Sequence, residues 1–271
     1  MALRSPIINV MGNAALKAAR GLIRDFGEVE QLQVSVKGPG DFVSTADLKA
    51  ERTLKNELGK ARPGYALLFE ESGAAPGTDP HHRWIVDPLD GTTNFLHGIP
   101  HFAISIGLER DGEMVAGVIY DPTRDEMFWA EKGIGAYLND RRLRVSGRRR
   151  LGEALIATGI PFREHGNHPD YLAGLAAIMA ETSGVRRFGS AALDLAYVAA
   201  GRYDGFWEVG LQPWDIAAGL LLVREAGGYV TDFAGRPNTM ESGEVLAANA
   251  HLHQPLAALI RDAVRSPQPA R

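Results

Sequence analysis

Cysteine is absent from the 271 residues of the sequence. Its absence excludes disulfide bonds, thiol nucleophiles and thiolate metal sites, and it is compatible with a reducing compartment. The sequence also has no apolar run long enough to span a bilayer and no signal-type apolar segment near its N-terminus. With a formal net charge of -4, it lacks the overall basic charge that attracts nucleic acids. These absences predict a cytoplasmic protein without a membrane partner.

The composition, with 45% hydrophobic and 23% charged residues, is that of an ordinary globular protein. We predict a single domain over residues 1–271 that consists of two halves. In residues 1–150, two helical segments precede a series of strands joined by tight turns, among which Asp111-Gly112 predicts a hairpin. In residues 151–265, strands alternate with helices, which indicates layered α/β packing. Residues 266–271 are predicted to form a disordered tail.

The clearest chemical signal is the segment WIVDPLDGTTNF at residues 84–95. Its apolar beginning predicts a buried strand that Pro88 should end, because proline has no N–H for a strand ladder. Gly91 permits the turn that follows. Asp87 and Asp90 then enter one small volume, where they repel each other unless a cation lies between them. With oxygen ligands only, that cation should be Mg²⁺ or another hard ion, and the N–H groups of the turn suit a phosphate. Asp-Pro or Asp-Gly alone would be no more than an ordinary polar turn.

Other acidic residues stand at the ends of predicted elements. Glu70 and Glu71 follow a predicted strand, and because neighbouring residues of an extended chain point to opposite faces, only one of them needs to enter a site. Asp47 and Asp215 stand at predicted helix starts, where the ordinary interpretation is a favourable interaction with the helix N-terminus. From the residues alone, a structural and a chemical role are both open for these positions.

Two charged segments have ordinary interpretations as surface loops. Residues 37–41, Lys-Gly-Pro-Gly-Asp, are a cluster of helix and strand breakers, which predicts either a mobile flap or a solvated turn. The arginines at positions 141, 142 and 148–150 form a basic cluster. A solvated loop is the ordinary interpretation of such a cluster, and contact with an acidic partner is the alternative.

The run from Asp87 to Phe95 resembles the signature of the inositol monophosphatase family, which are Mg²⁺-dependent, lithium-sensitive phosphatases. The segment PWDIAAGL at residues 213–220 is similar to a second motif of the same family. The resemblance covers about residues 8–264, and residues 187–228 look most like its bacterial SuhB-like branch. It implies an α+β fold, built as a layered αβαβα sandwich, and a homodimer.

The resemblance also implies a metal site and a mechanism. One Mg²⁺ would be held by Glu70, Asp87 and the Leu89 carbonyl, a second by Asp87, Asp90 and Asp215, and a third, weaker ion would bind near Glu70. Thr92, activated through Asp47, and Glu70 would orient the attacking water and take its proton. Water would attack phosphorus directly and in line, without a phosphoenzyme. Residues 37–41 match a metal-proximal loop of the family.

On the substrate side, the family places seven residues around the phosphate and the alcohol, namely Asp90, Gly91, Thr92, Gly189, Ser190, Ala191 and Glu208. Gln212 departs from those members that carry histidine there, which leaves the substrate open. The expected reaction is hydrolysis of inositol 1-phosphate and related polyol monophosphates. The alternatives are a sister phosphatase for histidinol phosphate, fructose 1,6-bisphosphate or a 3′-phosphoadenosine nucleotide. A further alternative is a non-catalytic antitermination factor that binds RNA polymerase through Arg186, Arg187 or the basic cluster.

Overall fold

The computed structural model describes residues 4–28, 34–38, 41–161 and 167–265. The predicted tail at 266–271 lies outside these residues. Within the described part of the chain, no helix has the length and apolar character required to cross a membrane.

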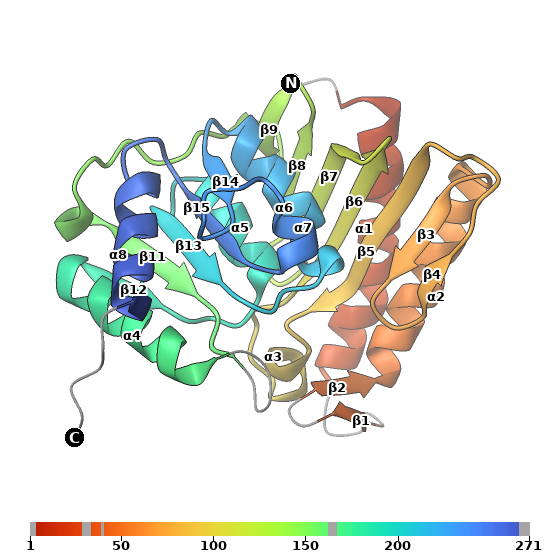
Figure 1. Ribbon diagram of the computed structural model, residues 1–271. Coiled ribbons are helices and arrows are strands. Elements are labelled where there is room, and N and C mark those ends of the chain that lie inside the picture. The colour runs from red at the N-terminus through yellow and green to blue at the C-terminus, as the bar shows by residue number, and fades with distance from the viewer. Residues whose placement is uncertain (1–3, 29–33, 39–40, 162–166, 266–271) are drawn as a thin grey trace.

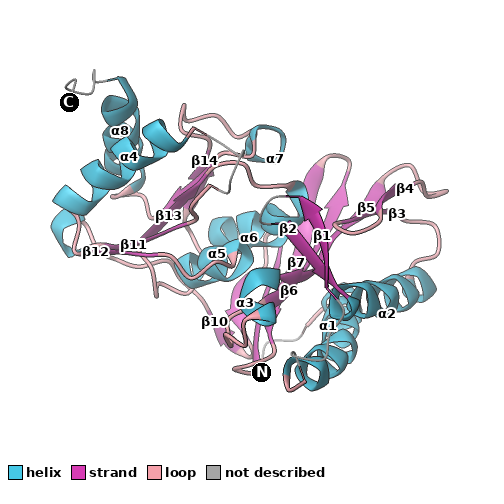
Figure 2. Ribbon diagram, turned by 90° about the horizontal axis from the view of Figure 1, so that it is seen from below, coloured by secondary structure: helices cyan, strands magenta, loops and turns pink. Residues whose placement is uncertain are grey.

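The chain folds into five layers of alternating helices and sheets (Figures 1 and 2). The first helical layer consists of α1 (Pro6–Phe26) and α2 (Thr45–Ala61), the central layer of α5 (Ala191–Ala199) and α6 (Pro213–Glu225), and the last layer of α4 (His168–Glu181) and α8 (His253–Arg265). An eight-stranded sheet separates the first and central layers, and a five-stranded sheet separates the central and last layers. This order is the αβαβα sandwich that the family resemblance implied.

The larger sheet has the strand order β10-β9-β8-β7-β6-β5-β3-β4. Its strands are β3 (Ala66–Phe69), β4 (Gly73–Ala75), β5 (His82–Asp90), β6 (Ala103–Arg110), β7 (Glu113–Asp121), β8 (Glu126–Glu131), β9 (Gly135–Leu138) and β10 (Arg141–Arg142). All neighbours are antiparallel except β3 and β5, whose carboxyl ends therefore meet at one edge and bring Glu70 close to Asp87. The predicted hairpin is confirmed, since Asp111 and Gly112 join β6 to β7 with φ angles of 52° and 80°.

The smaller sheet has the strand order β12-β11-β13-β15-β14. Its strands are β11 (Leu155–Thr158), β12 (Gly184–Arg186), β13 (Gly205–Glu208), β14 (Tyr229–Thr231) and β15 (Val245–Ala248). The strands β11 and β13 are parallel neighbours, so Gly159 and Glu208, at or directly after their carboxyl ends, lie side by side. The short elements η2 (Leu151–Glu153) and α7 (Thr239–Ser242) lie in the connections.

The prediction that Pro88 ends its strand is wrong. The strand β5 continues through Pro88 to Asp90, with an irregular register between Asp87 and Asp90 where it pairs with β6. At such a bulge a residue is not required to donate to the ladder, so proline is tolerated. The irregularity allows both aspartates to leave the strand at its carboxyl end.

The prediction of a loop at residues 37–41 is partly wrong. Lys37 belongs to β1 (Val34–Gly38) and Asp41 begins β2 (Asp41–Ser44), and the two strands form an antiparallel pair. Residues 39–40 lie outside the described part. The metal-proximal role of this segment stays a prediction.

The helix α6 packs closely on the larger sheet. A Cβ built at Gly117 of β7 would lie 3.0 Å from the Ala218 backbone, and one at Gly107 of β6 would lie 2.9 Å from the Ala217 Cβ. These glycines let the helix approach the strands more closely than side chains would allow. The close approach places the first turn of α6, which carries Asp215, beside the end of β5.

Candidate active site

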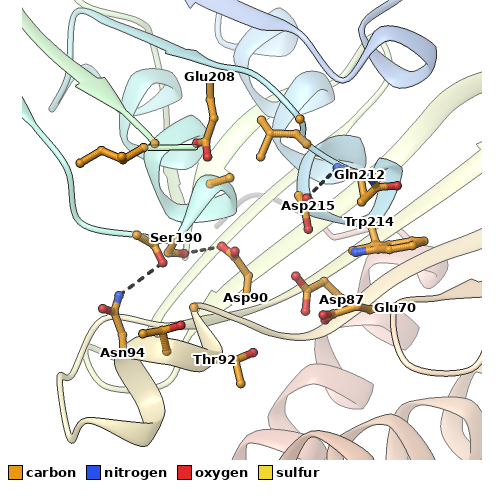
Figure 3. A pocket seen from close by; sticks show the side chains of 18 of the residues that line it. Glu70, Asp87, Asp90, Thr92, Asn94, Ser190, Glu208, Gln212, Trp214 and Asp215 are labelled. Carbon is orange, nitrogen blue, oxygen red and sulfur yellow. Dashed lines mark hydrogen bonds between the residues drawn. The ribbon is translucent and has the colours of Figure 1, made fainter. Parts of the chain in front are cut away.

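A cavity of about 430 Å³ lies where the carboxyl ends of β3, β5 and β13 meet the starts of α5, α6 and the short helix α3 (Thr92–Leu96) (Figure 3). It is lined by eleven of the twelve residues that the sequence singled out: Glu70, Asp87, Leu89, Asp90, Gly91, Thr92, Gly189, Ser190, Ala191, Glu208 and Asp215. Asp47 is fully buried behind Thr92 and does not line the cavity. The fold therefore brings together residues from both halves of the chain.

Asp87 and Asp215 are anchored by backbone N–H groups. The Leu89 N–H donates to Asp87 Oδ1 at 2.8 Å, and the Gln212 N–H donates to Asp215 Oδ2 at 2.7 Å. The second bond caps α6, so Asp215 fulfils the helix-start role as well as facing the cavity. Burial raises the pKa of both carboxyl groups well above its usual range, and the neighbouring carboxylates raise it further.

Asp90 links the two halves of the chain. Its Oδ2 accepts hydrogen bonds from the Ser190 hydroxyl and, at 2.9 Å, from the Ala192 N–H. Ser190 is also the N-cap of α5, whose Leu193 N–H donates to the serine oxygen. Burial raises the pKa of Asp90 to about 6, and the hydrogen bonds from Ser190 and Ala192 oppose this shift.

The Thr92 hydroxyl lies between two acceptors. Its oxygen is 3.2 Å from Asp47 Oδ1 and 3.0 Å from the Leu89 carbonyl oxygen. Asp47 in turn accepts from the N–H of Ser44, the N-cap of α2, in a reciprocal capping arrangement. Burial raises the pKa of Asp47, while the hydrogen bonds from Ser44 and Thr92 lower it. Asp47 is thus both a cap residue and a partner of Thr92.

Gly91 adopts a backbone conformation that requires glycine. Its φ angle is 96°, and a Cβ there would lie 3.1 Å from the His101 carbonyl oxygen and 3.3 Å from the Gly189 carbonyl oxygen.

Asn94, to which the sequence assigned no role, secures the same turn. Its Nδ2 donates to the carbonyl oxygens of His101 and Phe188 at 2.8 Å and 2.7 Å. The only sequence signal for this role was the position of Asn94 within residues 84–95.

The side of the cavity that faces the predicted alcohol is acidic. Burial and the nearby Asp90 carboxylate raise the pKa of Glu208 to about 8, against the opposing effect of Arg187. Among the described residues that line the cavity, Arg187 is the only cation. Asp194 is 1% exposed, burial raises its pKa, and its Oδ1 lacks a hydrogen-bond partner among the described residues. No sequence signal pointed to Asp194, which stands within the apolar helix α5.

The donor set fits a hard cation such as Mg²⁺. Asp87 and Asp215 each use one oxygen to accept a backbone N–H, and their second oxygens accept nothing within the described residues. Carboxylate oxygens are the ligands that Mg²⁺ prefers, and a cation would offset the repulsion that raises the pKa of these groups. Among the described residues, no three acidic or histidine side chains already stand close enough together to form a finished metal site. The type of ligand atom therefore suits Mg²⁺, although the described acidic side chains are not already arranged around a metal position.

The chain is similar to known proteins over nearly its whole length. Residues 3–265 match the sequence profile of the inositol monophosphatase family. The chain is 60% identical over 268 residues to the inositol-1-monophosphatase of Mesorhizobium japonicum, with 99% of each chain covered. The chain belongs to the inositol monophosphatase family. The family resemblance that the sequence indicated is thereby confirmed, and as a member of a phosphatase family the chain is an enzyme, a hydrolase of phosphate monoesters.

Two further relatives represent the SuhB-like branch of the inositol monophosphatase family. The chain is 45% identical over 257 residues to the Nus factor SuhB of Escherichia coli K12, with 95% of this chain and 96% of the relative covered. The crystal structure of the extragenic suppressor protein SuhB from Bartonella henselae matches with a TM-score of 0.93 and 59% identity, over 95% of this chain and 99% of the other.

Proposed function

We propose that this chain hydrolyses inositol 1-phosphate and related polyol monophosphates in a Mg²⁺-dependent reaction. The observation that carries the proposal is the cavity in which Glu70, Asp87, Asp90 and Asp215 converge beside the Gly91-Thr92 turn. Relatives from three bacteria with 54% to 60% identity, all named inositol-1-monophosphatase, support the choice of substrate.

In this proposal, Glu70, Asp87 and the Leu89 carbonyl hold one Mg²⁺, and Asp87, Asp90 and Asp215 hold a second. A third, weaker ion would bind near Glu70. Bound metal would lower the pKa of water and stabilise negative charge on the phosphoryl oxygens. The Gly91 and Thr92 N–H groups hold the phosphate.

The chain's own side chains direct the water. The Thr92 hydroxyl donates toward Asp47, which leaves the threonine oxygen free to accept a hydrogen bond from water. Glu70 accepts the proton of that water. The water oxygen forms a bond to phosphorus while the phosphorus–oxygen bond of the alcohol breaks in line. No residue becomes phosphorylated, and the alkoxide leaving group takes a proton from a solvent water and departs as the free alcohol.

The side of the cavity that carries Glu208 favours a substrate whose alcohol part has no second phosphate. Gly189, Ser190, Ala191 and Glu208 line the far side of the cavity, where Glu208 can accept hydrogen bonds from vicinal hydroxyl groups. A second phosphate there would face Glu208, with Arg187 as the only described cation lining the cavity. The scarcity of positive charge on this side of the cavity therefore disfavours fructose 1,6-bisphosphate and 3′-phosphoadenosine nucleotides. Histidinol phosphate, whose ammonium group could pair with Glu208, remains the sister substrate that charge does not disfavour.

The deciding experiment is phosphate release from D-myo-inositol 1-phosphate, with and without Mg²⁺. We expect Mg²⁺-dependent turnover by the wild-type enzyme and its loss in Asp90→Asn. Asp140→Asn, a substitution of the same kind at an exposed turn residue, is the control and should retain turnover. Absence of wild-type turnover would contradict the proposed substrate. The same assay with histidinol phosphate, fructose 1,6-bisphosphate and a 3′-phosphoadenosine nucleotide then ranks the alternatives, and added Li⁺ should inhibit.

A second function is proposed because several relatives with about 45% identity are named Nus factor SuhB. In that role the chain would bind RNA polymerase independently of catalysis, through the exposed Arg186 and Arg187 or the arginines at 141–150. RNA polymerase binding that persists in Asp87→Asn would support the role, and failure of the wild type to bind would exclude it.

We also propose that the chain forms a homodimer. Sedimentation as a monomer at micromolar concentration would contradict this proposal.

A further inference from the structure

Gly159 is unusual because another residue's functional group occupies the place of its missing side chain. A Cβ built at Gly159 would lie 1.8 Å from Oε1, 1.9 Å from Cδ and 2.2 Å from Oε2 of Glu208. Atoms that are not bonded do not approach so closely. Gly159 has no left-handed φ angle, so its backbone conformation is open to any residue. The three atoms nearest to that Cβ position all belong to the Glu208 carboxylate, which therefore imposes a requirement for glycine here.

The backbone on both sides of this contact is secured. In β11, Thr158 is fully buried and pairs with Trp207 of β13, and its hydroxyl donates to the Gly159 carbonyl oxygen at 3.1 Å. In β13, Glu208 pairs with Val245 of β15. Neither strand can therefore retreat easily from an added methyl group, whereas the end of the Glu208 side chain can rotate. A clash at Gly159 would be relieved by moving the carboxylate.

Gly159 and Glu208 both line the catalytic cavity. Figure 3 shows the Glu208 side chain directed into the cavity toward the side where Asp90 and Ser190 lie. We infer that Gly159 is a positioning residue for the alcohol side of the reaction. Because Gly159 lacks a side chain, the Glu208 carboxylate can lie at the cavity wall, where it accepts hydrogen bonds from substrate hydroxyl groups. This inference rests on the proposed function, because it assigns the hydroxyl-binding role to Glu208.

The kinetic test is a double-mutant cycle between Gly159→Ala and Glu208→Ala. For inositol 1-phosphate, Gly159→Ala should raise KM up to about tenfold with little change in kcat, because a hydrogen bond to the Glu208 carboxyl group is lost at a distance from the phosphorus. In the Glu208→Ala background the space is free, so the same substitution should change KM less than twofold. An equal effect of Gly159→Ala in both backgrounds would overturn the inference.

Two controls separate positioning from general damage. Phenyl phosphate carries no alcohol hydroxyl groups, so Gly159→Ala should leave its kcat/KM unchanged, and a parallel loss with this substrate would contradict a specific role. Gly147→Ala is the matched control, because a Cβ at Gly147 meets nothing within 4 Å and its φ angle is not left-handed. This variant should retain the wild-type KM for inositol 1-phosphate.

A crystal structure of Gly159→Ala decides the steric step independently of activity. The Glu208 carboxylate should be displaced from its wild-type position while β11 and β13 superimpose. An unmoved carboxylate beside the new methyl group would overturn the inference, even if KM had risen. Absence of wild-type turnover of inositol 1-phosphate would refute the proposed function and the hydroxyl-binding part of the inference. The crystal structure would still decide whether Gly159 positions Glu208.

Discussion

The buried histidine beside the catalytic turn makes stability depend on pH in a way that can be calculated. His101 is 6% exposed, its ring packs against Phe188 with 5.2 Å between centroids, and its Nε2 has no hydrogen-bond partner within the described residues. Burial and, to a smaller extent, the charge of Arg124 lower the pKa of His101 from an ordinary value of 6.5 to about 4, against the opposing effect of Asp121.

The folded state therefore binds a proton at His101 more weakly than the unfolded state does. Above pH 6.5 the histidine is neutral in both states and contributes no pH dependence. As the pH falls from 6.5 to 4, the unfolded chain takes up a proton that the folded chain does not, and stability is lost. A difference of about 2.5 pKa units corresponds to about 3 kcal/mol.

The substitution His101→Phe keeps an aromatic ring in the same position and removes the titration. We expect the free energy of unfolding of the variant, relative to that of the wild type, to rise by about 3 kcal/mol between pH 7.5 and pH 4. Urea denaturation followed by tryptophan fluorescence in metal-free buffer measures this difference. His97→Phe, at an exposed histidine, is the control. Parallel pH profiles of wild type and His101→Phe would refute the reasoning.

Three further predictions concern the catalytic turn and its metal. Thr92→Val, which loses the hydroxyl that faces Asp47, should lower kcat by about a hundredfold or more, whereas Thr92→Ser should retain most of it; equal losses would contradict the role of the hydroxyl. Gly91→Ala should lower the Tm because it forces a left-handed φ angle on alanine and a contact with the His101 carbonyl, and an unchanged Tm would count against that strain. Chelation of Mg²⁺ should lower the wild-type Tm, since a ligand at 100 times its Kd stabilises by about 2.7 kcal/mol, and should leave Asp87→Asn unaffected. A Tm that does not respond to Mg²⁺ in the wild type would exclude binding to the folded state.

Much of the fold followed from local sequence rules. Helices begin at residues that suit a cap, such as Ser44 before α2 and Ser190 before α5. The Asp111-Gly112 pair formed the hairpin that its φ angles require. The prediction for Pro88 was wrong because a proline is compatible with a strand where the register is irregular, as it is between Asp87 and Asp90 in the pairing of β5 with β6.

In the candidate site, too, some features follow from neighbouring residues and others only from contacts between distant parts of the chain. A single continuous segment placed Asp87, Asp90 and the Gly91 turn together, so its chemistry was visible in the sequence. The bond from Ser190 to Asp90, in contrast, joins residues 100 positions apart, and no local pattern specifies it. The fit of Glu208 into the space beside Gly159 and the burial of Asp194 also depend on how distant strands and helices pack.

The sequence by itself therefore predicted most helices and strands and the pair Asp87 and Asp90, because hydrophobic periodicity, turn conformation and the motif at 84–95 are properties of neighbouring residues. The αβαβα order and the roles of the other acidic residues were implied by the family resemblance. Only the tertiary structure decided which carboxylate oxygens of Asp87 and Asp215 accept a backbone N–H and which glycine makes room for Glu208. It also decided in which direction burial shifts the pKa of each acidic group. Distances, desolvation and steric exclusion arise between residues that are far apart in the chain, and they exist only once the layers have packed.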